Sequence, residues 1–211
     1  MPAPEVLILA SGGLRSLVAM ALACAESGAL KLTLLHVRDG RGHAAARLDY
    51  THRQAKHLGV PRVLEVDLAA GTVRGPERRA PVSAGLMAPR ILLSALVAAA
   101  ERPVGRIIWP AQTNGAAAPA ERCLEQAELV RHLGQLELPD LPAIETPLLE
   151  LTDAQLIELG GHLEVPWDLA WTCLLAGAQP CRLCAACRRR RAAFEAAGLI
   201  DPVAVLTAGA A

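Results

Sequence analysis

The sequence has very few aromatic residues: three tryptophans, one tyrosine and one phenylalanine make up 2% of 211 residues. Apolar residues still account for 53% of the chain, so leucine, valine, isoleucine and alanine must build its core. A chain of this length can bury one full-sized core and carry a small appendage. Lysine occurs only twice, and the many arginines and alanines indicate the composition of a GC-rich genome rather than a function.

Net charge and long apolar runs are also missing. The 21 basic residues balance the 21 acidic ones, so no overall field attracts nucleic acid or anionic lipid, and such binding would have to be local. No segment approaches the roughly 20 apolar residues that cross a bilayer. The apolar run Val6–Ala10 lacks a basic leader and is too short for a signal peptide. We therefore expect a cytoplasmic protein with reduced cysteines and no membrane contact.

Short apolar runs alternate with segments of helical length. The runs at 5–10, 31–37, 61–68 and 105–111 predict strands of a parallel sheet. Helices are expected at 14–27, 44–58, 90–101 and 120–133, and loops at 70–85 and 110–120. A proline-rich turn, a short strand and a helix capped by Thr152 or Asp153 follow. This order predicts an α/β fold, an open parallel sheet with helices on both faces.

Four of the six cysteines lie close together in the sequence, in the pattern C-x7-C-x2-C-x2-C. The two-residue spacers let neighbouring thiolates face one ion, and the longer loop can bring the fourth sulfur back. Four thiolates complete a tetrahedral zinc site without an open position, so the pattern predicts a structural Zn²⁺. A redox CxxC pair with bystander cysteines, or four small buried residues, is the alternative. The expected ligands are Cys173, Cys181, Cys184 and Cys187.

Four consecutive arginines, Arg188–Arg191, follow these cysteines. On a helix they point around most of the circumference, so they cannot form a single binding face. We expect a solvated helix start; contact with a phosphate or with an acidic partner surface is the alternative. A nucleic-acid binder using Arg182 and these arginines is disfavoured, because the neutral chain offers little electrostatic attraction.

The segment Ser11–Ser16, "SGGLRS", lies between the first expected strand and the first expected helix. Two glycines allow the backbone to approach a ligand closely, two serines offer hydroxyls, and the helix N-terminus attracts negative charge. The segment also lies at the carboxyl end of a strand, where α/β sheets bind their ligands. The pattern therefore favours a phosphate site, with a tight strand-to-helix turn as the alternative.

Two segments resemble known families. Ser11–Ser16 is similar to the SGGxDS loop of the ATP pyrophosphatases, and residues 171–202 resemble the cysteine-containing ending of the 7-cyano-7-deazaguanine synthase family. The resemblance implies an adenine nucleotide alpha hydrolase-like fold of the PP-loop superfamily, a four-cysteine zinc site and a homodimer. It also implies ligase-type chemistry, in which 7-carboxy-7-deazaguanine, ammonia and ATP give the nitrile precursor of queuosine. On this basis we expect a nucleotide-binding domain at 1–165 and a zinc module at 166–211, in one compact unit.

The resemblance also assigns site residues. Arg90 lies in a stretch that the family places near its deazapurine substrate. Residues Asp39 and His43 fall in a segment that the family places near the nucleotide. The remaining nucleotide-binding residues would hold the ATP phosphates: Ser11, Gly12, Gly13 and Ser16.

Two positions depart from the family pattern. Arg15 stands where the family has an aspartate near magnesium and pyrophosphate, and Asp153 stands where it usually has a lysine. Arginine cannot ligate Mg²⁺, although it can pair with phosphate. We expect either an ion pair between Arg15 and Asp153 in the former phosphate site, or two unrelated surface substitutions.

The sequence is compatible with two classes of function. The chain is either an ATP-using enzyme that needs ATP and Mg²⁺, acting on the deazapurine or on another substrate, or a catalytically inactive relative. The inactive relative would bind a nucleotide or a protein partner.

Overall fold

The computed structural model describes residues 4–40, 43–68 and 86–205. The loop expected at 70–85 lies outside these residues. A five-stranded parallel sheet with the order β3-β2-β1-β4-β5 forms the centre of the fold. Its strands are β1 (Glu5–Ala10), β2 (Leu32–Arg38), β3 (Arg62–Asp67), β4 (Val104–Ile108) and β5 (Ala143–Glu145).

The central strand β1 is buried on both faces, which explains its continuous apolar sequence. Val6 and Ile8 pack in the cluster that contains residues of α1 (Leu14–Ser27) and α2 (Ala44–Leu58). Leu7 and Leu9 pack on the opposite face in the cluster that contains residues of α3 (Met87–Ala100) and α4 (Ala117–Gln135). The predicted sheet with helices on both faces is therefore confirmed.

The helix boundaries differ from the expected ones by a few residues. Helices α1 and α2 begin and end where the sequence predicts, while α3 begins three residues earlier and α4 is extended at both ends. Helix α5 (Asp153–His162) is capped by Thr152: its hydroxyl accepts from the Gln155 amide, and the Gln155 side chain accepts from the Thr152 amide.

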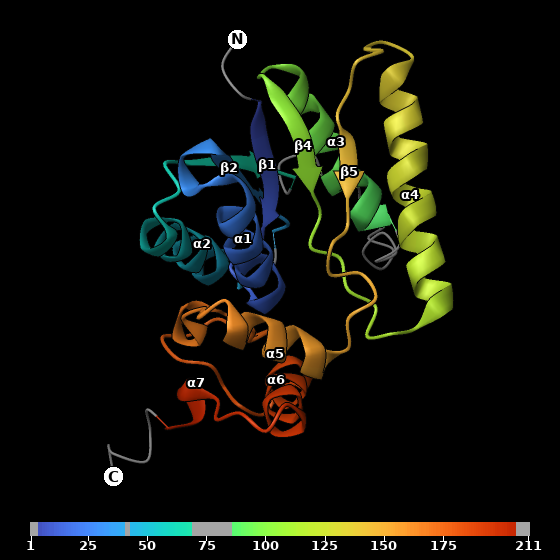
Figure 1. Ribbon diagram of the computed structural model, residues 1–211. Coiled ribbons are helices and arrows are strands. Elements are labelled where there is room, and N and C mark those ends of the chain that lie inside the picture. Colours follow the sequence, from blue (N-terminus) through green and yellow to red (C-terminus); the bar gives the residue numbers. More distant parts are fainter. Residues whose placement is uncertain (1–3, 41–42, 69–85, 206–211) are drawn as a thin grey trace, which may run out of the picture.

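The carboxyl-terminal helices lie beside the edge of the sheet toward which the strands point (Figure 1). They are α5, α6 (Ala185–Ala196) and the short α7 (Pro202–Val205), with a 3-10 turn, η3 (Trp167–Leu169), between α5 and α6. Phe194 of α6 packs with Ile157 of α5 and meets Trp167 edge to face, with ring centroids 5.3 Å apart. The expected division after residue 165 stays a prediction.

None of the helices in the described parts of the chain has both the length and the apolar character that a membrane span requires.

Candidate functional site

The turn after β1 requires glycine at position 12. Gly12 has a φ of +68°, and a Cβ built on it would lie 2.2 Å from the backbone oxygen of Arg47 in α2. Any other residue would combine a left-handed backbone with a severe overlap. The carbonyl of Gly12 accepts a 2.7 Å hydrogen bond from the Trp171 amide, which fixes the segment before the cysteines to the same turn.

Helix α1 begins at this turn without a side-chain cap. Gly13 is its extended N-cap residue, and the first turn contains no acidic residue. The Ser16 hydroxyl is fully buried and donates to the Gly13 carbonyl at 3.0 Å, so it braces the turn from inside. The Ser11 hydroxyl donates a long hydrogen bond to the Ser16 hydroxyl at 3.4 Å, and Ser11 lines a pocket beside the turn. An uncapped helix start of this kind attracts anions.

A pocket of about 140 Å³ opens beside the turn. Helices α1, α2, α5 and α6 and the Trp171 segment contribute to its wall. Among the described residues, its lining contains one carboxylate, that of Asp153, and four guanidinium groups. These belong to Arg15, Arg47, Arg189 and Arg190. Sequence reasoning identified Arg15 and Asp153 but missed Arg47, for which no local sequence signal exists.

The expected ion pair between Arg15 and Asp153 does not form. Asp153 is held by Arg189 instead, with Nε to Oδ2 at 2.6 Å and Nη2 to Oδ1 at 2.7 Å. Both carboxylate oxygens therefore already accept a strong hydrogen bond. The Asp153 amide donates to the Asn114 side chain at 2.7 Å, which fixes the start of α5 against the loop after β4. The two substitutions do share one pocket, but Arg189 makes the pair.

Arg15 forms neither a hydrogen bond nor an ion pair with any described residue. Arg15 is exposed, yet it lines the pocket, and desolvation by the neighbouring atoms lowers the pKa of Arg15. The positive charges of Arg189 and Arg47 lower that pKa further, while Asp153 raises it. The pocket thus carries an excess of positive charge around Arg15.

Arg190 is an exception to the expected solvated arginine run. It is 5% exposed and forms a bidentate pair with Asp201, with both bonds at 2.8 Å. It also donates to the carbonyls of Ala170 at 2.7 Å and Trp167 at 2.8 Å. Arg190 therefore ties α6 to η3 and to the chain before α7, and its charge is balanced within the protein.

Five of the expected site residues lie outside the pocket lining: Gly12 and Ser16 of the turn, and Asp39, His43 and Arg90. The buried His43 begins α2, and its Nδ1 lies 3.1 Å from the Leu174 carbonyl, next to the cysteines. Arg90 donates to the Leu68 carbonyl at 3.0 Å, just beyond β3. Asp39 follows β2 on the same edge of the sheet. Roles for these residues at a nucleotide or substrate stay predictions.

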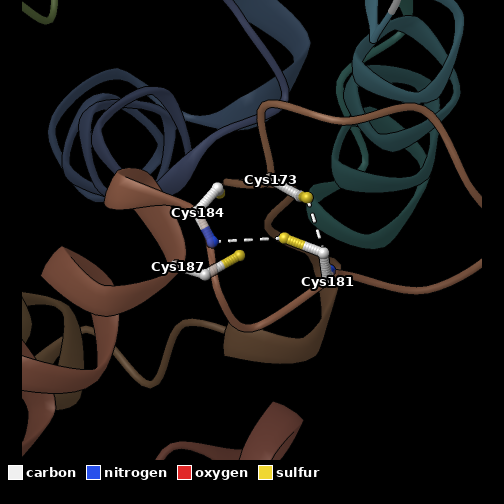
Figure 2. Close-up of side chains that lie close together, drawn as sticks. All are labelled: Cys173, Cys181, Cys184 and Cys187. Atoms are coloured by element: carbon white, nitrogen blue, oxygen red, sulfur yellow. Dashed lines mark hydrogen bonds between the residues drawn. The ribbon is translucent and has the colours of Figure 1, made fainter.

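The four cysteines meet as their spacing predicts. Their sulfur atoms all lie within 4.8 Å of one another, and Figure 2 shows the side chains gathered where the preceding loop meets the start of α6. Two backbone amides donate to the Cys173 sulfur at 3.4 Å, those of Leu175 and Cys181, and the Cys184 amide donates to the Cys181 sulfur at 3.3 Å. Such donors stabilise thiolates. We call these four residues the cysteine cluster.

The cysteine cluster fits a metal ion chemically as well. Backbone hydrogen bonds, from Cys184 first, lower the pKa of Cys181. At Cys184 burial opposes ionisation, but hydrogen bonds outweigh it and lower the pKa to about 6. Burial and its sulfur neighbours raise the pKa of Cys187 to about 12. A metal that binds all four sulfurs must therefore displace at least the Cys187 proton.

Magnesium, in contrast, does not fit the described pocket. Mg²⁺ prefers oxygen ligands and is usually held by one or two carboxylates together with substrate phosphates. The only carboxylate in the described lining is that of Asp153, and Arg189 occupies both of its oxygens.

Comparison with solved structures shows a shared fold. The U34-tRNA thiolase NcsA from Methanococcus maripaludis, determined with its [4Fe-4S] cluster, superposes with a TM-score of 0.53 at 14% identity, covering 91% of this chain and 64% of that one. The NMN synthetase from Francisella tularensis gives 0.52 at 18% identity, covering 97% and 82%. The chain therefore shares the α/β fold of these proteins, with a glycine turn at the end of β1.

Sequence comparison finds one matching family profile and several similar proteins of known name. A family profile described as "Queuosine biosynthesis protein QueC" matches residues 120–198. The 7-cyano-7-deazaguanine synthase of Trichodesmium erythraeum is 43% identical over 61 residues, 29% of this chain and 28% of that protein. The synthase of Chlorobaculum parvum is 24% identical over 222 residues, covering 94% of this chain and 95% of that protein. The chain is thus similar in sequence to 7-cyano-7-deazaguanine synthases, strongly over short segments and weakly over most of its length.

The similarity is uneven along the chain. In the relatives with 43–47% identity, the matched part spans only 26–28% of the relative's length. The relatives with 24–27% identity are matched over 92–95% of their length. The family profile covers α4 to α6 and all four cysteines, but not the turn after β1.

Proposed function

We propose that the chain binds ATP through its phosphates at the Ser11–Ser16 turn and uses it on the carboxylate of a deazapurine acid, releasing AMP and pyrophosphate. The relatives' name gives the nitrile as the product, and the resemblance implies 7-carboxy-7-deazaguanine as the acid. Ammonia supplies the nitrogen by displacing AMP, which carries away one carboxylate oxygen, and the other oxygen is lost when the amide is dehydrated to the nitrile. The observation that carries the proposal is the pocket itself. It joins an uncapped helix start and an arginine-rich wall at the edge of the sheet where such folds bind ligands.

A second candidate is a relative that binds a nucleotide without turning it over. The chemistry of the pocket favours this candidate at one point. Arg15 replaces the aspartate expected near the metal, and Asp153 is engaged by Arg189, so the described lining offers no carboxylate for magnesium. The two candidates share the nucleotide site and differ only in whether pyrophosphate is released.

The experiment that tests the proposal combines calorimetry with a product assay. The full chain is titrated with ATP and then incubated with ATP, ammonia and 7-carboxy-7-deazaguanine while pyrophosphate is measured. Saturable binding with pyrophosphate release that needs the deazapurine supports the enzyme. Saturable binding without release, also when other carboxylic acids are offered, supports the inactive relative. A chain that binds no ATP at millimolar concentration contradicts both.

For the cysteine cluster we propose zinc as the bound metal. A tetrahedral zinc with Zn–S bonds of about 2.3 Å places its sulfurs roughly 3.8 Å apart, which is compatible with sulfurs all within 4.8 Å of one another. A four-iron cluster is wider than a single ion and needs its cysteines further apart. Metal analysis of protein purified without chelators should find one zinc per chain; a brown protein containing iron would contradict zinc.

A cytoplasmic homodimer is the assembly that we propose. Reduced thiolates, which the metal site needs, persist in that compartment. Helix α4 also exposes apolar side chains that an interface could cover, among them Leu129, at 61% exposure, and Leu133, at 56%. Light scattering after size exclusion should give twice the mass of one chain, and a monomer at micromolar concentration would contradict the dimer.

A further inference from the structure

One positive charge of the pocket wall has no counter-charge paired with it among the described residues. Arg189 is paired with Asp153, and Arg190 is paired with Asp201. Arg15 has no hydrogen-bonding or ion-pair partner among the described residues, although it lines the same pocket. Arg47 also lines the pocket and has interactions of its own. The pocket therefore contains a guanidinium, that of Arg15, whose planar donor fork is available to an anion.

We propose that this pocket binds the phosphate chain of its nucleotide as a metal-free anion, with Arg15 supplying the positive charge that magnesium supplies elsewhere. The inference rests on the proposed nucleotide binding and specifies the form of the ligand. Arg15 is the second residue of α1 and lines the pocket. Its guanidinium and the backbone amides of the first helical turn therefore contact the same bound anion.

The physical argument depends on what each group offers to phosphate oxygens. Magnesium binds them through an octahedral shell that proteins complete with carboxylates. Arginine donates two parallel hydrogen bonds and carries a permanent charge, which suits a terminal phosphate directly. Both neutralise the same oxygens, so they compete. A pocket whose one described carboxylate is already held by Arg189 favours the arginine.

A second observation supports the excess of positive charge. Besides burial, which is the largest cause, the charges of Arg189 and Arg47 disfavour ionisation of Arg15, while those of Asp153 and Cys123 favour it. A bound pyrophosphate group would reverse this repulsion, because it places negative charge among the guanidinium groups. The wall is therefore more complementary to a highly charged anion than to the same anion already neutralised by a divalent cation.

Calorimetry of the full chain with ATP and with inorganic pyrophosphate tests the inference. Each ligand is titrated once in EDTA and once in excess magnesium chloride. We expect the dissociation constant in EDTA to equal or to be lower than that in magnesium. Binding that weakens about tenfold or more in EDTA overturns the inference and leaves nucleotide binding intact. No binding in either condition overturns the proposed nucleotide binding and, with it, the inference.

Variants at position 15 identify the group responsible. Arg15→Ala should weaken binding of metal-free ATP about tenfold or more, because a charge-assisted contact is lost. Arg15→Lys keeps the charge but loses the planar pair of donors of the guanidinium. Its dissociation constant for metal-free ATP should lie between those of the wild type and Arg15→Ala. Arg191→Ala removes the same charge from an exposed position on α6, where Arg191 lies 3.7 Å from Glu195, and should leave the constant within about twofold.

Arg15→Asp is the converse change, since it restores a carboxylate at the turn. We expect this variant to bind ATP only with magnesium. Wild-type affinity for metal-free ATP in Arg15→Ala or Arg15→Asp would overturn the inference, provided that thermal unfolding shows a folded protein.

Discussion

The turn that forms the pocket should not tolerate a side chain at Gly12. In Gly12→Ala, the left-handed backbone at φ +68° costs roughly 1–2 kcal/mol. The new Cβ would also lie 2.2 Å from the Arg47 carbonyl oxygen, which is part of the α2 backbone and cannot rotate away. Forced shifts of this kind cost about 1–3 kcal/mol. We therefore expect a loss of about 2–5 kcal/mol in the free energy of unfolding.

Gly59→Ala provides the matched control. Gly59 ends α2 with a φ of +71°, but the nearest atom to its added Cβ, in Ala29, is 3.9 Å away. This variant should lose only the backbone contribution of roughly 1–2 kcal/mol. Urea unfolding of both variants, with m-values compared, isolates the overlap, and calorimetry should show weakened ATP binding in Gly12→Ala alone. If the two variants are equally stable, the close contact between the turn and α2 is refuted.

Three further predictions concern groups outside the turn. Arg190→Ala should lose about 3–5 kcal/mol because it leaves Asp201 buried without its partner, whereas Arg191→Ala should change urea stability by less than about 0.5 kcal/mol; similar losses would contradict the burial. Zinc at roughly 1,000 times its dissociation constant should add about 4 kcal/mol of stability that a chelator removes, and an unchanged melting temperature after chelation would contradict a structural metal. Burial lowers the pKa of His36, so as the pH falls the unfolded chain binds a proton at this position before the folded chain does. The stability contributed by neutral His36 should therefore be complete above about pH 6.5 and decline below it. His36→Gln should reduce this decline when urea midpoints are measured against pH.

The sheet and its helices could be predicted because local patterns determine them. The β1 sequence is continuously apolar and its burial on both faces follows, while Thr152 and Gln155 form the capping box that marks the start of α5. The cysteine cluster was predictable for the same reason: its spacing alone limits how far apart the sulfurs can lie. Exact helix ends were less accurate, since tertiary packing extends or shortens the last turns.

The pairing of charges could not be predicted, because it depends on contacts between distant segments. Asp153 and Arg189 are 36 residues apart, and nothing local distinguishes Arg189 from Arg15 as the partner of Asp153. Arg190 did carry a signal that was missed. It lies three residues after Cys187 and four before Phe194, which places it on the buried face of α6.

A crystal structure of the chain grown with ATP in EDTA tests the central claim most directly. The account predicts phosphate oxygens within hydrogen-bonding distance of the backbone amides at the start of α1 and of the Arg15 guanidinium, with Asp153 and Arg189 at the rim of the same pocket. A nucleotide bound elsewhere, or phosphates in the pocket that Arg15 does not touch, would contradict it.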